Sequence, residues 1–130
     1  MQPREAFWSE WTPRILSVVR VVMALLFLQH GLSKFFGFPG AAPAHLMLFP
    51  QIIAGTIEVI GSLLLLVGLF TRFAALIMSG EMAIAYWMSH APRSPYPITN
   101  GGEAAIMFCF VFLYFVFAGG GAWSVDSRHG

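Results

Sequence analysis

Cysteine and charged residues are scarce in this 130-residue sequence, and each scarcity excludes a class of function. Cys109 is the single cysteine and lies in an apolar run, which excludes an internal disulfide framework, a CxxC redox pair and a cysteine-based metal site. Charged residues make up 10% of the chain and the formal net charge is +1. Without a basic field, a Lys/Arg run or a nucleic-acid motif, the chain is not expected to bind nucleic acid.

Hydrophobic residues, by contrast, make up 58% of the sequence, and the mean hydropathy is +0.74. Soluble globular domains lie far below this value. Four apolar stretches, at about 15–36, 51–70, 71–90 and 102–119, each approach the length needed to cross a bilayer as a helix. The sequence therefore predicts an all-α polytopic membrane protein, an antiparallel four-helix transmembrane bundle that forms one domain over residues 1–130.

The first apolar stretch carries three basic or titratable side chains, Arg20, His30 and Lys34. At about 100° per residue these positions fall in one narrow stripe of the helix. An ionisable group at mid-bilayer costs on the order of 3 kcal/mol on insertion scales. We therefore expect the stripe to face protein rather than lipid.

Each of the other three stretches supplies one carboxylate, Glu58, Glu81 or Glu103. Charges at lipid depth are less costly when they are paired, so we expect a buried polar network. The most plausible pairs are Lys34 or His30 with Glu103, and Arg20 with Glu58 or Glu81. The candidate polar or ligand-binding cluster comprises Arg20, His30, Lys34, Glu58, Glu81, Asn100 and Glu103. No catalytic residue is assigned within it.

The distribution of arginines predicts the orientation. Four arginines, Arg4, Arg14, Arg72 and Arg128, belong to the side that holds both termini, whereas Arg93 lies in the opposite loops. The positive-inside rule then places both termini in the cytoplasm of a bacterial cell, with the protein in the inner membrane. The proline-containing loops 37–50 and 91–101 face outward. Segment 1–14 mixes charges with tryptophans, which is typical of a juxtamembrane collar.

The residues alone leave the role of the charges open. They could form a structural salt-bridge core that fixes helix register, or a site that handles a ligand or protons. A haem held between His30 and His90 is disfavoured. A metal site formed by these histidines with Glu103 is also disfavoured, because it lacks tight ligand spacing.

Several separated sequence strings resemble the DoxX family of small four-span membrane proteins. These strings are R-x9-HG-x2-K at 20–34, Glu58 followed by Gly61, L-x-G-L-x-T-R at 66–72, NGGE at 100–103, and G-x-G-x-W-S-x-D at 119–126. In the family the last string commonly begins Gly-Pro-Gly, and here Gly120 replaces the proline. The resemblance implies a four-span fold. Members are often described as membrane oxidoreductase subunits. Some resemble the large subunit of thiosulfate:quinone oxidoreductase, and others are linked to thiol and oxidative-stress complexes.

The leading functional hypothesis is a quinone-linked subunit of a membrane redox complex. Quinone reduction takes up protons at two oxygens, so the site needs donors such as His30, Lys34 or Arg20 and carboxylates such as Glu58 or Glu103. Electrons would come from a partner protein, because the chain has no evident covalent cofactor or redox centre of its own. The alternatives are a non-enzymatic scaffold for a partner or a homo-oligomer, and a small-solute or proton pathway.

Overall fold

The computed structural model describes residues 2–40 and 49–129, and all regular structure in this part of the chain is helical. The elements are α1 (Pro3–Phe36), α2 (Phe49–Val67), α3 (Thr71–Ala85), the π-helical turn η2 (Tyr86–His90), the 3-10 turn η3 (Ala91–Arg93), α4 (Pro97–Asn100), α5 (Glu103–Ala118) and α6 (Val125–His129). Most of the expected loop 37–50 lies outside the described residues.

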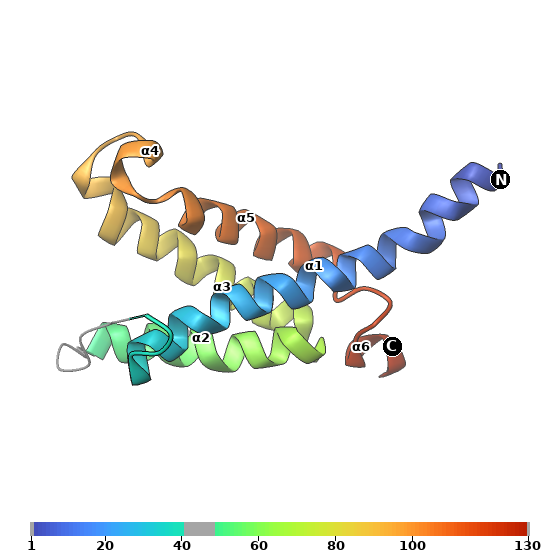
Figure 1. The fold of residues 1–130 in the computed structure, drawn as a ribbon, viewed down its shortest axis with the longest axis horizontal. Coiled ribbons are helices and arrows are strands. Elements are labelled where there is room, and N and C mark those ends of the chain that lie inside the picture. The colour runs from blue at the N-terminus through green and yellow to red at the C-terminus, as the bar shows by residue number, and fades with distance from the viewer. Residues whose placement is uncertain (1, 41–48, 130) are drawn as a thin grey trace.

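The helices α1, α2, α3 and α5 lie along one another, and consecutive ones run in opposite directions (Figure 1). Helix α1 packs on α2, α3 packs on α5, and α2 contacts α3. Both termini lie at one end of the molecule, which we call the terminal end, and α4 lies at the other, which we call the loop end (Figure 1). The stripe of cations on α1 therefore has α2 as its main neighbour.

Helix α1 begins at Pro3, whereas the sequence predicted a span that begins at residue 15. Pro3 occupies the first turn, where a missing N–H costs nothing. Gln2 and Glu5 form a capping box in which the Gln2 N–H donates to the Glu5 carboxylate at 3.4 Å. These signals place the start of α1 before residue 15, and Pro13 lies inside the helix. The N-terminal part of α1 projects beyond the other helices (Figure 1).

The third apolar stretch is not one uniform helix. Its α-helical part ends at Ala85 and is followed by the π turn Tyr86–His90 and the 3-10 turn Ala91–Arg93. Pro92 disfavours continued α-helix at the residue before it, which accounts for the change in winding. As a result, His90 points to the following loop, and its Nδ1 atom lies 3.1 Å from the Asn100 carbonyl oxygen.

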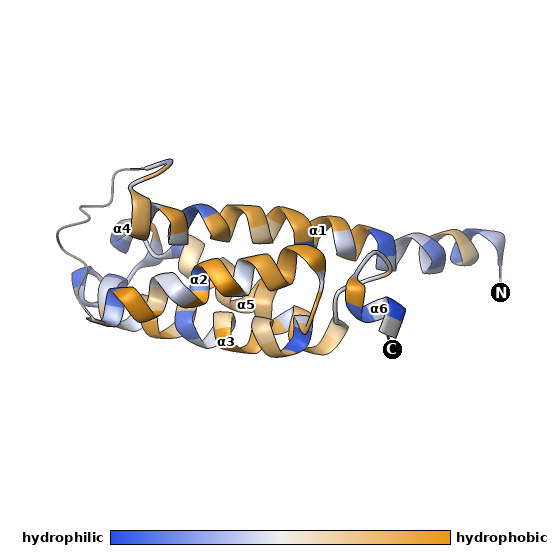
Figure 2. Ribbon diagram, turned by 90° about the horizontal axis from the view of Figure 1, so that it is seen from below, coloured by the Kyte–Doolittle hydropathy of each residue, from blue (hydrophilic) through white to orange (hydrophobic). Residues whose placement is uncertain are grey.

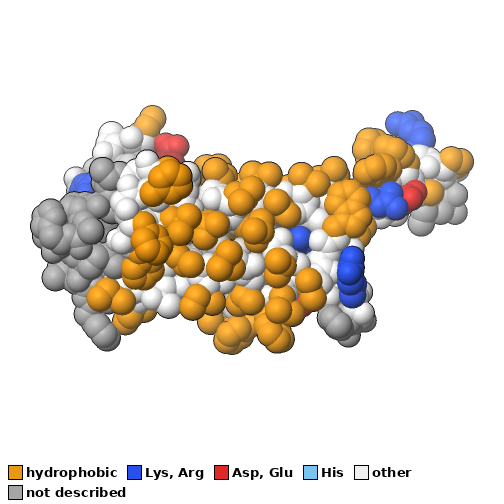
Figure 3. Space-filling model, turned by 60° about the horizontal axis from the view of Figure 1, so that its bottom comes forward, with side chains coloured by type: hydrophobic (Ala, Val, Ile, Leu, Met, Phe, Trp, Pro, Cys, Tyr) orange, Lys and Arg blue, Asp and Glu red, His pale blue; other side chains and the backbone are white. Residues whose placement is uncertain are grey.

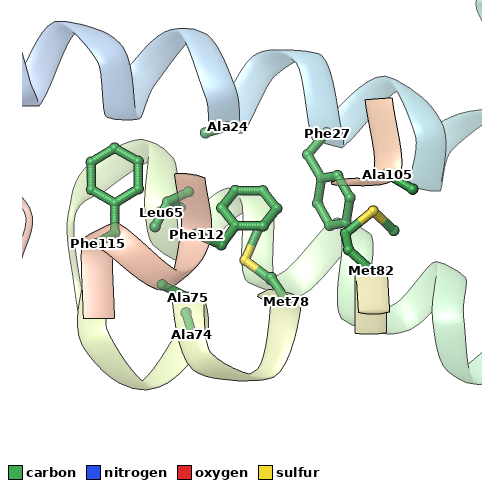
Figure 4. Packing of buried hydrophobic residues seen from close by; sticks show 10 residues of the cluster. All are labelled: Ala24, Phe27, Leu65, Ala74, Ala75, Met78, Met82, Ala105, Phe112 and Phe115. Atoms are coloured by element: carbon green, nitrogen blue, oxygen red, sulfur yellow. The ribbon is translucent and has the colours of Figure 1, made fainter. Parts of the chain in front are cut away.

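The apolar core lies between the four long helices (Figure 4). Phe27 of α1 packs edge-on against Phe112 of α5, with ring centroids 4.9 Å apart. Small residues such as Ala74 and Ala75 lie among the large ones and let the helices approach closely. The buried hydrophobic residues are Ala24, Phe27, Leu65, Ala74, Ala75, Met78, Met82, Ala105, Phe112 and Phe115.

The long helices consist largely of hydrophobic residues (Figure 2), and many of the large hydrophobic side chains are exposed. Figure 3 shows a face covered largely by hydrophobic side chains, with most of the visible charges near its two ends. Phe117, for example, is 75% exposed. Two helices, Pro3–Phe36 and Pro50–Val67, are long and apolar enough to cross a membrane. A continuous apolar surface of this kind suits lipid rather than water.

Candidate functional site

Lys34 and Glu58 form an ion pair between α1 and α2. The Lys34 Nζ atom donates to Glu58 Oε1 at 2.6 Å and also contacts Oε2. The Glu58 side chain is 0% exposed, whereas that of Lys34 is 32% exposed. The pairing of Lys34 with Glu103 predicted from the sequence is therefore wrong, and Glu103 is exposed at the start of α5.

Gly31 explains why Lys34 reaches Glu58. It lies almost one turn before Lys34 on the face of α1 that meets α2. A Cβ atom at this position would lie 2.7 Å from Val59 Cγ2 and 3.0 Å from Glu58 Cβ. Because only glycine fits this gap, the two helices approach closely at the depth of the ion pair. The HG-x2-K string thus contains both Gly31, which permits the close contact between α1 and α2, and Lys34, which pairs with Glu58.

Glu81 of α3 adds a second carboxyl group to this pair. Its side chain lies close to that of Glu58. The Glu81 Oε2 atom is buried and has no hydrogen-bond partner in the part of the chain that the structure describes. We call Lys34, Glu58 and Glu81 the carboxyl-lysine cluster.

Two grooves meet at this cluster. The first, of about 440 Å³, is mainly apolar and is lined by residues of α2 and α3 together with Lys34 and Glu81. The second, of about 310 Å³, is lined by Lys34 and Glu58 together with His30 and His90. We call them the apolar groove and the histidine groove. Lys34 lines both, whereas each carboxyl group lines one.

His30 lies beside the cluster rather than inside an ion pair. Its ring packs edge-on against Phe108, with centroids 5.9 Å apart, and it also contacts the Phe27 ring. The predicted pair of His30 with Glu103 is not found among the described interactions. His30, His90 and Glu103 do not form a metal-binding group, and no group of three potential ligands that could hold a metal ion occurs within residues 2–40 and 49–129.

Arg20 is separated from the carboxyl-lysine cluster and binds backbone carbonyl oxygens instead. It is 2% exposed, and its Nε and Nη2 atoms donate to the carbonyl oxygens of Leu65 and Trp123, both at 2.8 Å. Its Nη1 atom donates to the Gly120 carbonyl oxygen. The predicted pairing of Arg20 with Glu58 or Glu81 is therefore wrong. The physical reason is that Leu65 lies in the last turn of α2, where its carbonyl oxygen has only a 3.2 Å contact from the Gly68 N–H and can also accept from a cation.

Asp126 of α6 lies beside Arg20 and caps the start of α3. Its Oδ1 and Oδ2 atoms accept hydrogen bonds from the backbone N–H groups of Phe70 and Thr71, at 2.9 and 2.8 Å. Partial burial acts to raise the pKa of the Asp126 carboxyl group, but the contacts with Thr71 and Phe70 and the positive charge of Arg20 outweigh it, and this pKa lies below its usual value. We call Arg20, Gly120, Trp123 and Asp126 the terminal clasp.

The sequence did not identify Asp126 as important, although it ends the G-x-G-x-W-S-x-D string. Gly121 in this string has a φ of +86°, and a Cβ atom there would lie 2.5 Å from the Pro13 carbonyl oxygen. The glycines therefore let the C-terminal segment lie against α1 and the turn between α2 and α3. The string at 119–126 therefore supplies three residues of the terminal clasp, namely Gly120, Trp123 and Asp126.

Asn100 holds the loop at the other end. It is 1% exposed, and its Nδ2 atom donates to the Ser94 carbonyl oxygen at 3.0 Å and to the Tyr86 hydroxyl at 3.2 Å. Its Oδ1 atom accepts from the Gly102 N–H at 2.8 Å. The polar atoms of Asn100 are thus directed at the loop and η2, and the residue positions the edge of the histidine groove.

The comparisons with known proteins agree with the strings identified in the sequence. The DoxX family profile matches residues 15–91. A protein of Haemophilus influenzae described as an uncharacterized protein is 43% identical over a matched region that covers 92% of this chain and 94% of the relative. No solved structure matches the chain. The profile covers more than half of the sequence and includes Arg20 and the whole carboxyl-lysine cluster, and the chain belongs to the DoxX family of membrane proteins.

Proposed function

We propose that the protein crosses the bacterial inner membrane four times, with both termini in the cytoplasm. The antiparallel course of α1, α2, α3 and α5 and the apolar outer surface support this arrangement (Figures 1 and 3). The arginine distribution supports the orientation, because the terminal end carries more arginines than the loop end. A fluorescent protein fused to the C-terminus should be bright and an alkaline phosphatase fusion inactive, and the reverse pattern would contradict the orientation.

Within this frame, we propose that the apolar groove binds a quinone and that the protein is a quinone-linked subunit of a membrane redox complex. The observation that carries the proposal is the composition of the groove, whose walls include Ile53, Ile57 and Ile84 and which also reaches Lys34 and Glu81. Apolar walls suit a quinone ring and its isoprenoid tail. The ammonium and carboxyl groups suit the carbonyl oxygens, which accept hydrogen bonds and take up protons on reduction.

The electron donor would be a partner protein, since the proposed site holds and protonates the quinone without a redox group of its own. The chain's own contribution is to orient the ring, exclude water through the apolar walls, and hold a proton at the Glu81 carboxyl group. Arg20 and Glu103, which the sequence also suggested for this task, lie outside the groove.

The test uses the purified protein in lipid nanodiscs and a short-chain benzoquinone as the probe. We expect the probe to raise the unfolding temperature of the wild type by an amount that depends on its concentration. Glu81→Leu removes the donor and should weaken binding up to about tenfold, because a neutral hydrogen bond is worth roughly 0.5–1.5 kcal/mol. The control Glu103→Leu changes an exposed carboxylate outside the groove and should bind like the wild type.

An unchanged unfolding temperature in the wild type, or equal binding by wild type and Glu81→Leu, would contradict the quinone site. Co-purification of a partner without quinone binding would then support the scaffold alternative. Glu58-dependent solute or proton flux in proteoliposomes would support the pathway alternative.

A further inference from the structure

A smaller groove continues the apolar groove along the seam between α2 and α3. The last α2 residue that lines the apolar groove is Ile57, and Ile57 also lines this smaller groove, which has a volume of about 190 Å³. We call it the seam groove. It is lined by α2 within 56–64 and by α3 within 73–78. Since Ile77 precedes Glu81 by about one helical turn, the seam groove begins beside the Glu81 carboxyl group and leads toward the terminal end.

The course of the two helices explains the shape of this path. A short turn joins α2 to α3 at the terminal end, and the helices separate toward the loop end, so the space between them narrows along the seam (Figure 1). Gly61 is buried, and a Cβ atom there would lie 2.8 Å from Met78 Sδ, so the helices touch beneath the seam groove. Ile60 and Ile77, which line it, are exposed. The seam groove is therefore closed toward the core and open to the lipid side.

The polarity of the lining changes along the path. At the loop end, the polar side chains of Gln51 and Ser89 help to line the apolar groove, and the carboxyl-lysine cluster follows. Among the described residues that line the seam groove, Thr56 alone has a polar side chain, and its hydroxyl group donates to the Ile52 carbonyl oxygen at 2.8 Å. The seam groove thus offers a ligand only hydrocarbon contacts, whereas the opposite direction leads past polar side chains.

We infer that the seam groove binds the isoprenoid tail of the quinone, so that the substrates are prenylated quinones whose tail points toward the terminal end. The inference rests on the proposed function, because the ring in the apolar groove fixes where the tail begins. A prenylated quinone is polar at its ring and hydrocarbon along its tail, and the linings of the two grooves follow the same order.

The ring is what selects this tail over the chains of the surrounding lipid. Lipid chains are as apolar as the seam groove, so the hydrophobic effect gives no preference for one hydrocarbon over another. A ring that is bound in the apolar groove holds its own tail beside the seam groove at a high effective concentration. The tail then gains many small dispersion contacts with side chains that are fixed on the two helices.

The experiment measures the binding of two probes in lipid nanodiscs, a benzoquinone without a tail and the same ring with a geranyl tail. Ile60→Trp/Ile77→Trp narrows the seam groove from both helices. Leu63→Trp/Leu76→Trp is the matched control, because these leucines are exposed on the same helices and line neither groove. Each probe is compared among proteins in the same nanodiscs, so its partition into the lipid cancels.

We expect Ile60→Trp/Ile77→Trp to weaken binding of the geranyl probe at least about fivefold, because the tail loses its contacts. Binding of the tailless probe should stay as in the wild type, and the control should bind both probes normally. Equal binding of the geranyl probe by Ile60→Trp/Ile77→Trp and the wild type would overturn the inference, as would equal weakening of both probes. Failure of both probes to bind the wild type would instead overturn the proposed function, and this inference with it.

A second measurement locates the tail in the wild type. A geranyl probe that carries a diazirine at the end of its tail is photolysed in the nanodiscs, and the labelled residues are mapped by mass spectrometry. We expect labelling within 60–64 and 73–77 that an excess of the unlabelled geranyl probe suppresses. Labelling that extends equally to the exposed Val18 and Val22 of α1 and is not suppressed would show that the seam groove holds bulk lipid only, and would overturn the inference.

Discussion

The helix α1 buries its two cations, Arg20 and Lys34, in opposite ways. At the terminal end, Arg20 donates to carbonyl oxygens of α2 and of the C-terminal segment. Toward the loop end, Lys34 pairs with Glu58, Glu81 lies beside this pair, and two grooves reach the cluster. In the first region, all three guanidinium nitrogens of Arg20 donate hydrogen bonds. The second has one buried carboxyl oxygen, Glu81 Oε2, without a partner in the described chain.

The chemistry of the two cations fits this difference. A guanidinium group has five donors in a rigid fork and stays charged, so it can join several fixed carbonyl groups. An ammonium group is a compact charge on a flexible stem, and it can remain near a carboxylate while a proton moves. We interpret the terminal clasp as the part that stabilises the fold and the carboxyl-lysine cluster as the part that carries function.

The largest effect is expected for Arg20→Met. The substitution leaves several buried carbonyl groups unsatisfied and removes the positive charge beside Asp126, which should lower the free energy of unfolding by roughly 3–5 kcal/mol. Arg20→Lys keeps the charge but loses most of the donors, and we expect it to recover less than half of this loss. Denaturant titration in detergent micelles measures both. Near-wild-type stability of Arg20→Met would remove the basis for treating the clasp as structural.

A smaller effect is expected where α1 meets α2. Gly31→Ala places a methyl group against Val59 and Glu58, which should cost roughly 1–3 kcal/mol and draw Lys34 away from its partner. Gly80→Ala is the matched control, because a Cβ atom there meets nothing within 4 Å. Thermal unfolding of the two variants should differ clearly, with Gly80→Ala close to the wild type. Equal behaviour would show that close packing at Gly31 is unimportant.

Lys34→Met should cost less than Arg20→Met, about 1–2 kcal/mol, because a neighbouring carboxyl group can take up a proton in place of the lost cation. Adding Glu58→Gln to Lys34→Met should restore part of the loss, since it removes the excess carboxyl group. Urea unfolding of the single and double variants measures the coupling. A double variant less stable than the single one would show that the carboxyl groups stabilise the fold independently of Lys34.

The smallest effect is expected for Asp126→Asn, at about 1 kcal/mol for a weakened helix cap. Since the pKa of Asp126 is lower in the folded protein, its contribution is fully present above the unfolded pKa of about 3.9 and is lost as the pH falls through the folded value. The difference in unfolding temperature between wild type and variant should therefore be largest near neutral pH and disappear on acidification. A difference that does not depend on pH would contradict the role of the ionised carboxylate.

The helical class, the DoxX family and the inward direction of Arg20 and Lys34 could be predicted from the sequence, because helical periodicity and hydropathy depend on local residue spacing. The ion pairs could not be predicted. Arg20 donates to backbone carbonyl oxygens at the end of α2 and in the C-terminal segment, and such acceptors cannot be recognised from residue identity. The choice of Glu58 for Lys34 depends on the packing of α1 on α2 at Gly31, which only the tertiary structure reveals.

The most direct test of the division between the two regions is the free energy of unfolding of two neutralised variants, measured side by side in the same micelles. Lys34→Met/Glu58→Gln/Glu81→Gln removes every charge of the carboxyl-lysine cluster at similar volume, and we expect its stability to lie within about 1 kcal/mol of the wild type. Arg20→Met/Asp126→Asn neutralises the terminal clasp and should lose more than about 3 kcal/mol. A triple variant as unstable as the clasp variant would contradict the assignment of function to one region and stability to the other.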